Sequence, residues 1–223
     1  MSKIPGLLIS FAIVGVLLGC AGIAPQVAGG FDAKGLKKRK LVVFRKAPIV
    51  TVASDFSTSS FQSSNIRAIF KENFEDQGVD LRGFEKRIDS IFFEEIQDMS
   101  SFGKITIDTV SQKDSVAFVQ FQNGGKTLMG RIPHSIPNDS ALILGLGRII
   151  YTKESDFDKP GKPFLVARMD YIIYDPLLGQ PVVGGRVEAR SSSLLGYAIL
   201  EGDWYADIKK LASHLVDDLI ELR

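Results

Sequence analysis

The sequence predicts an α+β domain in which an antiparallel sheet carries helices packed on one face and the C-terminal helix is amphipathic. After one strand-like run, apolar residues follow helical spacing, a series of strand-like runs comes next, and a final apolar stripe at helical spacing ends the chain. Strands joined by short turns pair in antiparallel fashion. Helices and strands that are segregated along a chain are typical of α+β folds.

Composition limits the classes of protein to which the chain can belong. Of its 223 residues, 24% are charged and 45% hydrophobic, which is the balance of a folded domain with a sizeable core. The formal net charge is +1, so the chain has no strong overall positive field. We therefore expect no nucleic-acid partner.

The N-terminal segment has the order of a secretory signal. Lys3 supplies a positive charge, residues 4–16 are almost entirely apolar, and LLGC follows at residues 17–20. Cys20 is the only cysteine, so it cannot form a disulfide within the chain. An uncleaved membrane helix is the alternative, since residues 4–31 contain few polar side chains. Glycines and prolines in the second half of that stretch argue against the helix.

Leu17-Leu18-Gly19-Cys20 resembles the lipobox of bacterial lipoproteins. The resemblance implies that residues 1–19 are a signal peptide, and that Cys20 carries diacylglycerol and a further acyl group such as palmitate. Three acyl chains hold a protein at a membrane almost permanently. Ala21 follows the cysteine where inner-membrane lipoproteins of this type carry aspartate, which implies the periplasmic face of the outer membrane.

Residues 20–40 are expected to form a lipidated flexible tether, and residues 41–223 a single periplasmic α+β domain. Apolar periodicity begins just after the glycine-rich part of the tether, so a protein that starts at Phe31 is expected to fold. The tether ends in a basic stretch, which is either a solvated strand margin or a contact for phospholipid head groups. Its residues are Lys34, Lys37, Lys38, Arg39, Lys40, Arg45 and Lys46.

Two helices are expected after a first core strand at Ile49–Ala53, which is rich in β-branched residues. The spacing of apolar residues predicts one helix over residues 61–76 and a second that Asp80 caps. One face of the second helix carries Leu81, Phe84, Ile88, Ile91, Phe92, Ile96 and Met99.

The strands expected next have alternating or continuous apolar patterns. Asn123-Gly124-Gly125 indicates a hairpin turn between two of them. The two strongest strands, Ala141–Tyr151 and Phe164–Tyr174, are expected to pair antiparallel. The others are Lys104–Val110, Val116–Phe121, Lys126–Ile132 and Val182–Ala189.

The last helix is expected to have Asp203 as its cap and one apolar face that packs in the core. Deleting residues 205–223 is therefore expected to unfold the body, unless the stripe is instead an exposed docking face for a partner. The residues of the stripe are Ile208, Leu211, Ala212, Leu215, Leu219 and Leu222.

In pattern, the strand around residues 139–149, the strand pair that follows it and the terminal helix resemble the periplasmic domains of envelope lipoproteins. Examples are the curli-secretion and transport-auxiliary lipoproteins. The resemblance is loose and covers mainly the last third of the chain. It implies a role in envelope assembly or transport, with other envelope proteins as partners and a possible homo-oligomer.

No group of residues in the body predicts catalysis, a cofactor or a metal. Gly145 and Gly147 lie inside an apolar strand, where a tight packing position or bulge is favoured over a phosphate-binding loop. His134 lies in a loop. His214 lies one helical turn before Asp217 and Asp218, and two or three such side chains at helical spacing are more typical of an exposed pair than of a metal site.

The sequence therefore predicts a non-enzymatic, membrane-anchored lipoprotein that acts through protein–protein contacts in the cell envelope. The alternative is a lipid- or glycan-binding lipoprotein, which needs an apolar cavity or aromatic groove between the sheet and its helices. A hydrolase is a third possibility. An exposed apolar patch or free strand edge favours a protein partner, whereas a buried histidine beside a serine and a carboxylate favours catalysis.

Overall fold

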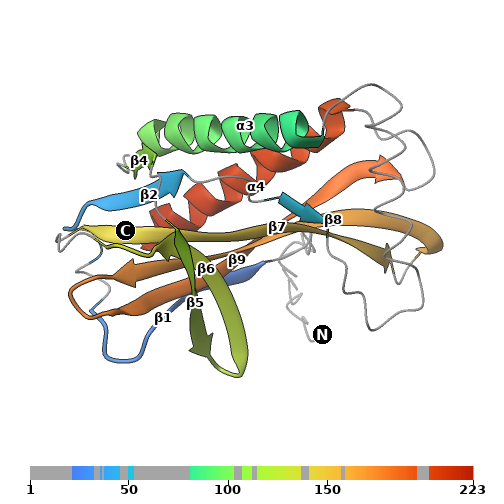
Figure 1. Ribbon diagram of the computed structural model, residues 1–223. Helices are drawn as coiled ribbons and strands as arrows, with labels where there is room; N and C mark the ends of the chain where they lie inside the picture. The colour runs from blue at the N-terminus through green and yellow to red at the C-terminus, as the bar shows by residue number, and fades with distance from the viewer. Residues whose placement is uncertain are drawn as a thin grey trace, which may run out of the picture.

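The computed structural model shows a large twisted sheet with two long helices (Figure 1). It describes residues 22–32, 36, 38–45, 50–52, 81–102, 107–111, 115–136, 141–156, 159–194 and 201–222. The helices are α3 (Leu81–Phe102) and α4 (Glu201–Leu222). The strands are β1 (Ile23–Val27), β2 (Leu41–Arg45), β3 (Val50–Val52), β4 (Ile107–Ser111), β5 (Val116–Asn123), β6 (Lys126–Pro133), β7 (Leu142–Asp156), β8 (Lys159–Asp175) and β9 (Gln180–Leu194).

The centre of the sheet is the meander β7–β8–β9, whose three strands pair antiparallel. The main path through the sheet has the order β1-β9-β8-β7-β2-β4. The predicted α+β class and the pairing of the two strongest strands are therefore confirmed. The sheet is not purely antiparallel as expected, because β2 pairs parallel with β4 and β7, and β3 pairs parallel with β7. Long connections through other elements permit parallel pairing, which tight turns cannot form.

The predicted apolar stripes of both helices are buried in one core. On α3 the buried residues include Ile88, Phe92 and Ile96, and on α4 they include Ile208 and Leu215. In Figure 1 the two helices lie together on one side of the long strands. The amphipathic character of the C-terminal helix is thus confirmed, and its apolar face is not an exposed docking surface.

The helix caps and the first strand differ in detail from the sequence prediction. The helix predicted to follow Asp80 is present as α3, and Asp80 itself lies outside the described residues. Asp203 lies inside α4, which begins two residues earlier, so the predicted cap is wrong. The strand expected at Ile49–Ala53 is present as β3 but is third in the chain. The helix expected at residues 61–76 lies outside the described residues.

The β5–β6 hairpin crosses the side of the sheet opposite to the helices (Figure 1). Its turn is the one predicted, with positive φ angles of 56° at Gly124 and 77° at Gly125. Phe121 and Leu128 face the sheet and form a second, smaller core with Ile172 of β8. The hairpin thus covers only part of this face and leaves the rest exposed.

Gly145 and Gly147 are the positions at which the hairpin crosses β7. A Cβ on Gly147 would lie 2.8 Å from the carbonyl oxygens of both Met129 and Asp170, and one on Gly145 would lie 2.9 Å from the side chain of Ile172. The β7–β8 register also shifts between Leu146 and Ile149. The predicted tight packing and bulge are both present.

The N-terminal region departs most from the prediction. Residues 23–27 of the expected tether form β1, which pairs antiparallel with β9 at the edge of the sheet. The amide of Ala28 donates to the carbonyl of Val182, and Leu36 is buried. The register shifts between Ile23 and Gln26, where Pro25 lies. Proline is tolerated at an edge strand or bulge because no ladder hydrogen bond is needed there. Pro25 therefore does not prevent a strand here, although in the sequence it argued for a tether.

Part of the predicted basic stretch has a structural role. Arg39 forms a bidentate ion pair with Asp175 at the end of β8, with Nη1–Oδ2 at 2.6 Å and Nη2–Oδ1 at 2.9 Å. Burial alone would raise the pKa of Asp175, but hydrogen bonds from Arg39 and from the amide of Leu177 outweigh it and hold this pKa below its usual range. Lys38 and Lys40 are exposed beside this pair.

We expect Arg39→Gln to lower the free energy of unfolding by about 3 kcal/mol at neutral pH, because it leaves a buried carboxylate without its charge partner. A carboxyl group whose folded-state pKa is lowered stabilises the fold above its unfolded pKa of about 3.9, and that contribution is lost as the pH falls toward the folded value. Urea titrations from pH 7 to pH 3 should therefore show a smaller acid-induced loss in Arg39→Gln than in the wild type. Parallel pH profiles would contradict the assignment.

Candidate functional site

A groove of about 520 Å³ lies on the sheet face opposite to the helices, in the angle between the β5–β6 hairpin and strands β7–β9. Its apolar wall consists of Phe118, Met129 and Ile150, all of which are notably exposed for large apolar side chains. Its charged residues come from neighbouring strands and are Arg148, Arg168, Asp170 and Arg186. We call this feature the arginine groove.

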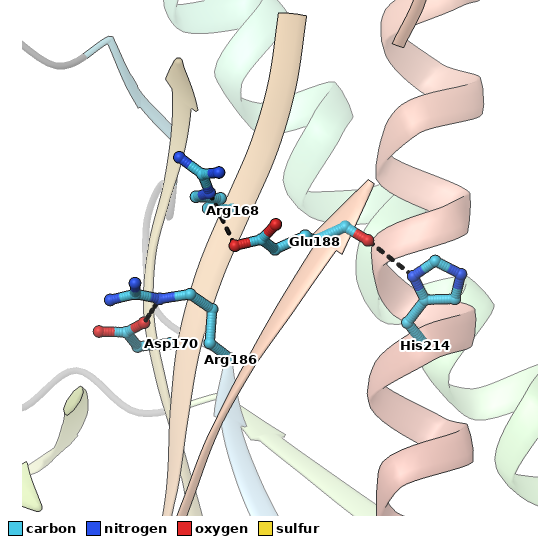
Figure 2. Close-up of polar contacts among 5 residues, drawn as sticks. All are labelled: Arg168, Asp170, Arg186, Glu188 and His214. Carbon is cyan, nitrogen blue, oxygen red and sulfur yellow. Dashed lines mark hydrogen bonds and ion pairs between the residues drawn. The ribbon is translucent and has the colours of Figure 1, made fainter. Parts of the chain in front are cut away.

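Two ion pairs organise the floor of the arginine groove (Figure 2). Nε of Arg186 lies 2.6 Å from Oδ1 of Asp170, and Nε of Arg168 lies 2.7 Å from Oε1 of Glu188. The other oxygen of Asp170 accepts a 3.2 Å hydrogen bond from the amide of Met129. The carboxylates thereby fix the directions of two guanidinium groups on rigid strands.

Arg148 differs from the other two arginines of the groove. It is exposed and forms no ion pair with the described residues, and its guanidinium lies over the ring of Phe118, 5.5 Å from the centroid. Arg131 lies close enough that Arg148 lowers its pKa, after the larger effect of burial. Arg148, which has no ion partner among the described residues, therefore adds positive charge to this end of the groove.

The chemistry of the arginine groove suits the binding of an anion better than proton transfer. A guanidinium group does not give up its proton in proteins, so the three arginines cannot act as general acids or bases. Guanidinium groups bind phosphate and carboxylate through parallel N–H donors. The lining thus has fixed donors for an anionic group, next to an apolar wall.

Two sequence-derived candidates on α4, His214 and Asp218, each make a hydrogen bond to the sheet. Nδ1 of His214 lies 2.7 Å from the carbonyl oxygen of Glu188, so the ring reaches β9 from the helix side (Figure 2). Asp218 accepts a 2.9 Å hydrogen bond from the hydroxyl of Tyr171. Burial raises the pKa of Asp218, and this hydrogen bond opposes the increase. His134 is exposed in its loop.

Cys20 lies outside the described residues. Among the residues that are described, no three His, Cys, Asp or Glu side chains are grouped to hold a metal ion, and neither helix is long and apolar enough to cross a membrane.

The arginines of the groove were not predicted from the sequence. The signal was present as polar residues at alternate positions of two strands, namely Arg168 and Asp170 on β8, and Arg186 and Glu188 on β9. Alternate residues of a strand share one face. Without the pairing of these strands, however, the same pattern describes an ordinary solvent-facing side.

A second exposed feature lies at the β8–β9 turn. Leu177 and Leu178 are 63% and 55% exposed. Asp175 fixes this turn, because its Oδ1 accepts a 2.9 Å hydrogen bond from the amide of Leu177 and its carbonyl accepts one from the amide of Gly179. Gly179 has a positive φ of 66°, which favours glycine. Two leucines are therefore held in solvent by a turn with a fixed conformation, which we call the leucine turn.

No protein-family model and no curated protein matches the chain in sequence. Among solved structures, the PelC dodecamer from Paraburkholderia phytofirmans aligns at 8% identity over 89% of this chain and 97% of that chain, with a TM-score of 0.34. Protein XCC0632 from Xanthomonas campestris, of family DUF330, aligns at 12% identity over 79% and 81%, with a TM-score of 0.36. Likeness at these TM-scores gives no support for a function.

Proposed function

We propose that this chain is a bacterial lipoprotein, anchored through Cys20 to the periplasmic face of the outer membrane, that works without catalysis by binding other envelope proteins. The leucine turn is the observation that carries the partner-binding role. A turn whose backbone is already fixed loses little backbone entropy when a partner covers its exposed side chains. Clustered apolar residues at an exposed tip are typical of contact sites.

The lipobox resemblance supports the anchor, and the position of β1 limits how far the domain could lie from it. The first residue of β1 follows Cys20 by three positions. Three extended residues span at most about 10 Å, so a lipid on Cys20 would hold the edge of the sheet at the membrane surface. The expected long tether is therefore replaced by a short one, and the domain has little freedom to leave the bilayer.

The chemistry of the arginine groove supports a non-enzymatic role. Its charged side chains are permanently protonated guanidinium groups and a carboxylate engaged by Arg186 and by the amide of Met129. Binding is the task to which this lining is suited. An enzyme with a perturbed acid or base would need a different set of side chains.

The alternative, a lipid- or glycan-binding protein, required a cavity between the sheet and the helices. Side chains of α3, α4 and the sheet fill that space as a single buried core. The groove lies instead on the opposite face. A ligand-binding role would therefore use the arginine groove, and a homo-oligomer would most simply use the edge strands β1 and β4, which end the main sheet path.

Cys20→Ala is expected to leave an unprocessed precursor that incorporates no palmitate label, because only the thiol can accept diacylglycerol. The measurement is metabolic labelling with radioactive palmitate, followed by fractionation of inner and outer membranes. Wild-type protein should carry label and sediment with the outer membrane. Label on Cys20→Ala would disprove the anchor, and wild-type protein found only in the inner membrane would disprove the location.

A photo-crosslinking residue at position 178 should give a discrete adduct with an envelope protein in intact cells. The same residue at Lys210, which is exposed on α4, serves as the matched control and should give none. Leu177→Ser should reduce the adduct at position 178 at least about tenfold, since it removes half of the apolar contact. Equal adducts at both positions, or an adduct indifferent to Leu177→Ser, would argue against the leucine turn as a partner site.

A further inference from the structure

We propose that the arginine groove binds the phosphate of phospholipid head groups in the same leaflet that holds the Cys20 acyl chains. This inference rests on the proposed lipid anchor. It assigns phospholipid as the ligand of the sheet face opposite to the helices, and it turns that face toward the membrane. Three features carry it: where the first described residues lie, which charge is available, and the mixed lining of the groove.

The first described residues of the chain lie beside the groove. Ile23 pairs with Arg186, which is one of the lining arginines. Gly22 is pressed so closely against β9 that a Cβ there would overlap the carbonyl oxygen of Arg186. Since Cys20 precedes Gly22 by two residues, a lipid attached to it would begin within roughly 10 Å of this point. Acyl chains on Cys20 would therefore enter the bilayer next to the groove.

The charge of the groove suits an anionic surface. Its lining has three arginines and one aspartate, and Glu188 neutralises Arg168 from outside the lining, which leaves a local charge of +1 (three minus two). Arg148 supplies that charge in an exposed position. Arg186 contacts Asp170 through Nε alone. The ion pair therefore orients the guanidinium group and leaves its two terminal nitrogens able to donate to a ligand.

The apolar wall explains why a lipid fits better than a small soluble anion. Phe118, Met129 and Ile150 expose apolar surface directly beside the guanidinium groups. An interface between head groups and acyl chains presents the same pairing of phosphate and hydrocarbon. The volume of about 520 Å³ is within the range of sites that hold one molecule of moderate size.

The basic stretch between Lys34 and Lys46 is a weaker candidate for the membrane contact than the arginine groove. Arg39 is committed to Asp175, at the end of the sheet where β8 turns into β9. On β9 that end is about six residues from Arg186, or about 20 Å along the strand, so it lies away from the point at which the anchor leaves. Among the basic residues that the structure describes, those of the arginine groove lie closer to the proposed anchor than Arg39 does.

The test uses mature, lipidated protein reconstituted in vesicles and an introduced thiol. Ile150→Cys places a label in the groove, and Lys210→Cys places the matched control label on α4, on the other side of the sheet. Both are labelled with an environment-sensitive fluorophore. Because lipidation consumes the Cys20 thiol, parent protein should not take up the label. Uptake by the parent protein would show a failed anchor, which distinguishes failure of the proposed function from failure of the groove assignment.

In vesicles that contain phosphatidylglycerol, quenching by neutral acrylamide at position 150 should fall at least about threefold relative to phosphatidylcholine vesicles, while position 210 stays unchanged. About 0.5 M salt should reverse the protection. Arg148→Gln or Arg186→Gln, each added to the labelled protein, should return quenching at position 150 to within about 1.5-fold of its value in phosphatidylcholine vesicles, whereas Lys38→Gln should leave the protection unchanged.

Protection that is independent of anionic lipid, or equal at positions 150 and 210, would overturn the proposal. Soluble glycerol phosphate separates the two sources of the same chemistry. If it shifts the fluorescence at position 150 while phosphatidylglycerol vesicles do not, the groove takes a soluble phosphate ester and the head-group assignment is wrong.

Discussion

Removing residues 205–223 is expected to abolish the cooperative unfolding transition of the domain. Six side chains of α4 are fully buried in the core shared with α3, β8 and β9: Ile208, Leu211, Ala212, Leu215, Val216 and Leu219. Burial of a large aliphatic side chain contributes about 1.5 to 3 kcal/mol, so together they rival the roughly 5 to 15 kcal/mol net stability of a whole domain. The truncated sheet would also expose the apolar side that α4 covers.

Circular dichroism and thermal melts of the full and truncated proteins measure this effect. Leu215→Ala is the graded version and should cost about 2 to 5 kcal/mol, because it leaves a cavity at a fully buried position. Lys210→Ala, on the exposed side of the same helix, is the matched control and should change stability by no more than about 0.5 kcal/mol. A monomeric truncated protein that melts as cooperatively as the parent would show that α4 is not an essential part of the core.

A protein that begins at Phe31 is expected to be less stable than one that begins at Ala21, by about 3 kcal/mol or more. The shorter protein lacks β1, whose Ile23 and Val27, with the following Ala28, pack against the two cores of the sheet. Partial burial of three apolar side chains accounts for about this amount. Loss of β1 also leaves β9 as an unpaired edge, which favours association between molecules.

Urea denaturation compares the two starting points, and size-exclusion chromatography reports association. We expect the shorter protein to unfold at a lower urea concentration and to elute partly as oligomers. The control is Gly29→Ala in the longer protein, since a Cβ there meets no atom within 4 Å and the strand is retained. Equal denaturation midpoints for the two starting points would show that the edge strand contributes nothing, and that the flexible-tether interpretation was adequate.

Local patterns predicted those parts of the fold that depend on neighbours in sequence. The spacing of Ile88, Phe92 and Ile96 predicted α3 and its buried face, because helical periodicity decides which side chains share a surface. Asn123-Gly124-Gly125 predicted the β5–β6 turn, since only residues that tolerate positive φ fit there. The apolar runs of β7 and β8 predicted their antiparallel pairing through a short connection.

Patterns of the same kind misled where a contact joins distant residues. Pro25 and the nearby glycines indicated a tether, yet β9 lies alongside and gives β1 a partner at an edge where proline costs no hydrogen bond. Arg39 was one of several basic residues until Asp175, 136 positions away, identified it as half of an ion pair. His214 and Asp218 were expected as an exposed pair one helical turn apart, and only the structure shows that each also bonds to the sheet.

By itself, the sequence determined the lipobox-like segment that ends at Cys20, the two amphipathic helices and the antiparallel meander, because each depends on residues that are adjacent or regularly spaced along the chain. Only the tertiary structure decided the parallel pairing of β2 and β3, the crossing of the hairpin over Gly145 and Gly147, and the arginine groove. The groove draws its residues from five strands, β5 to β9. Strand alternation specifies which residues share a face, but only the pairing of strands and the position of the hairpin decide which faces meet.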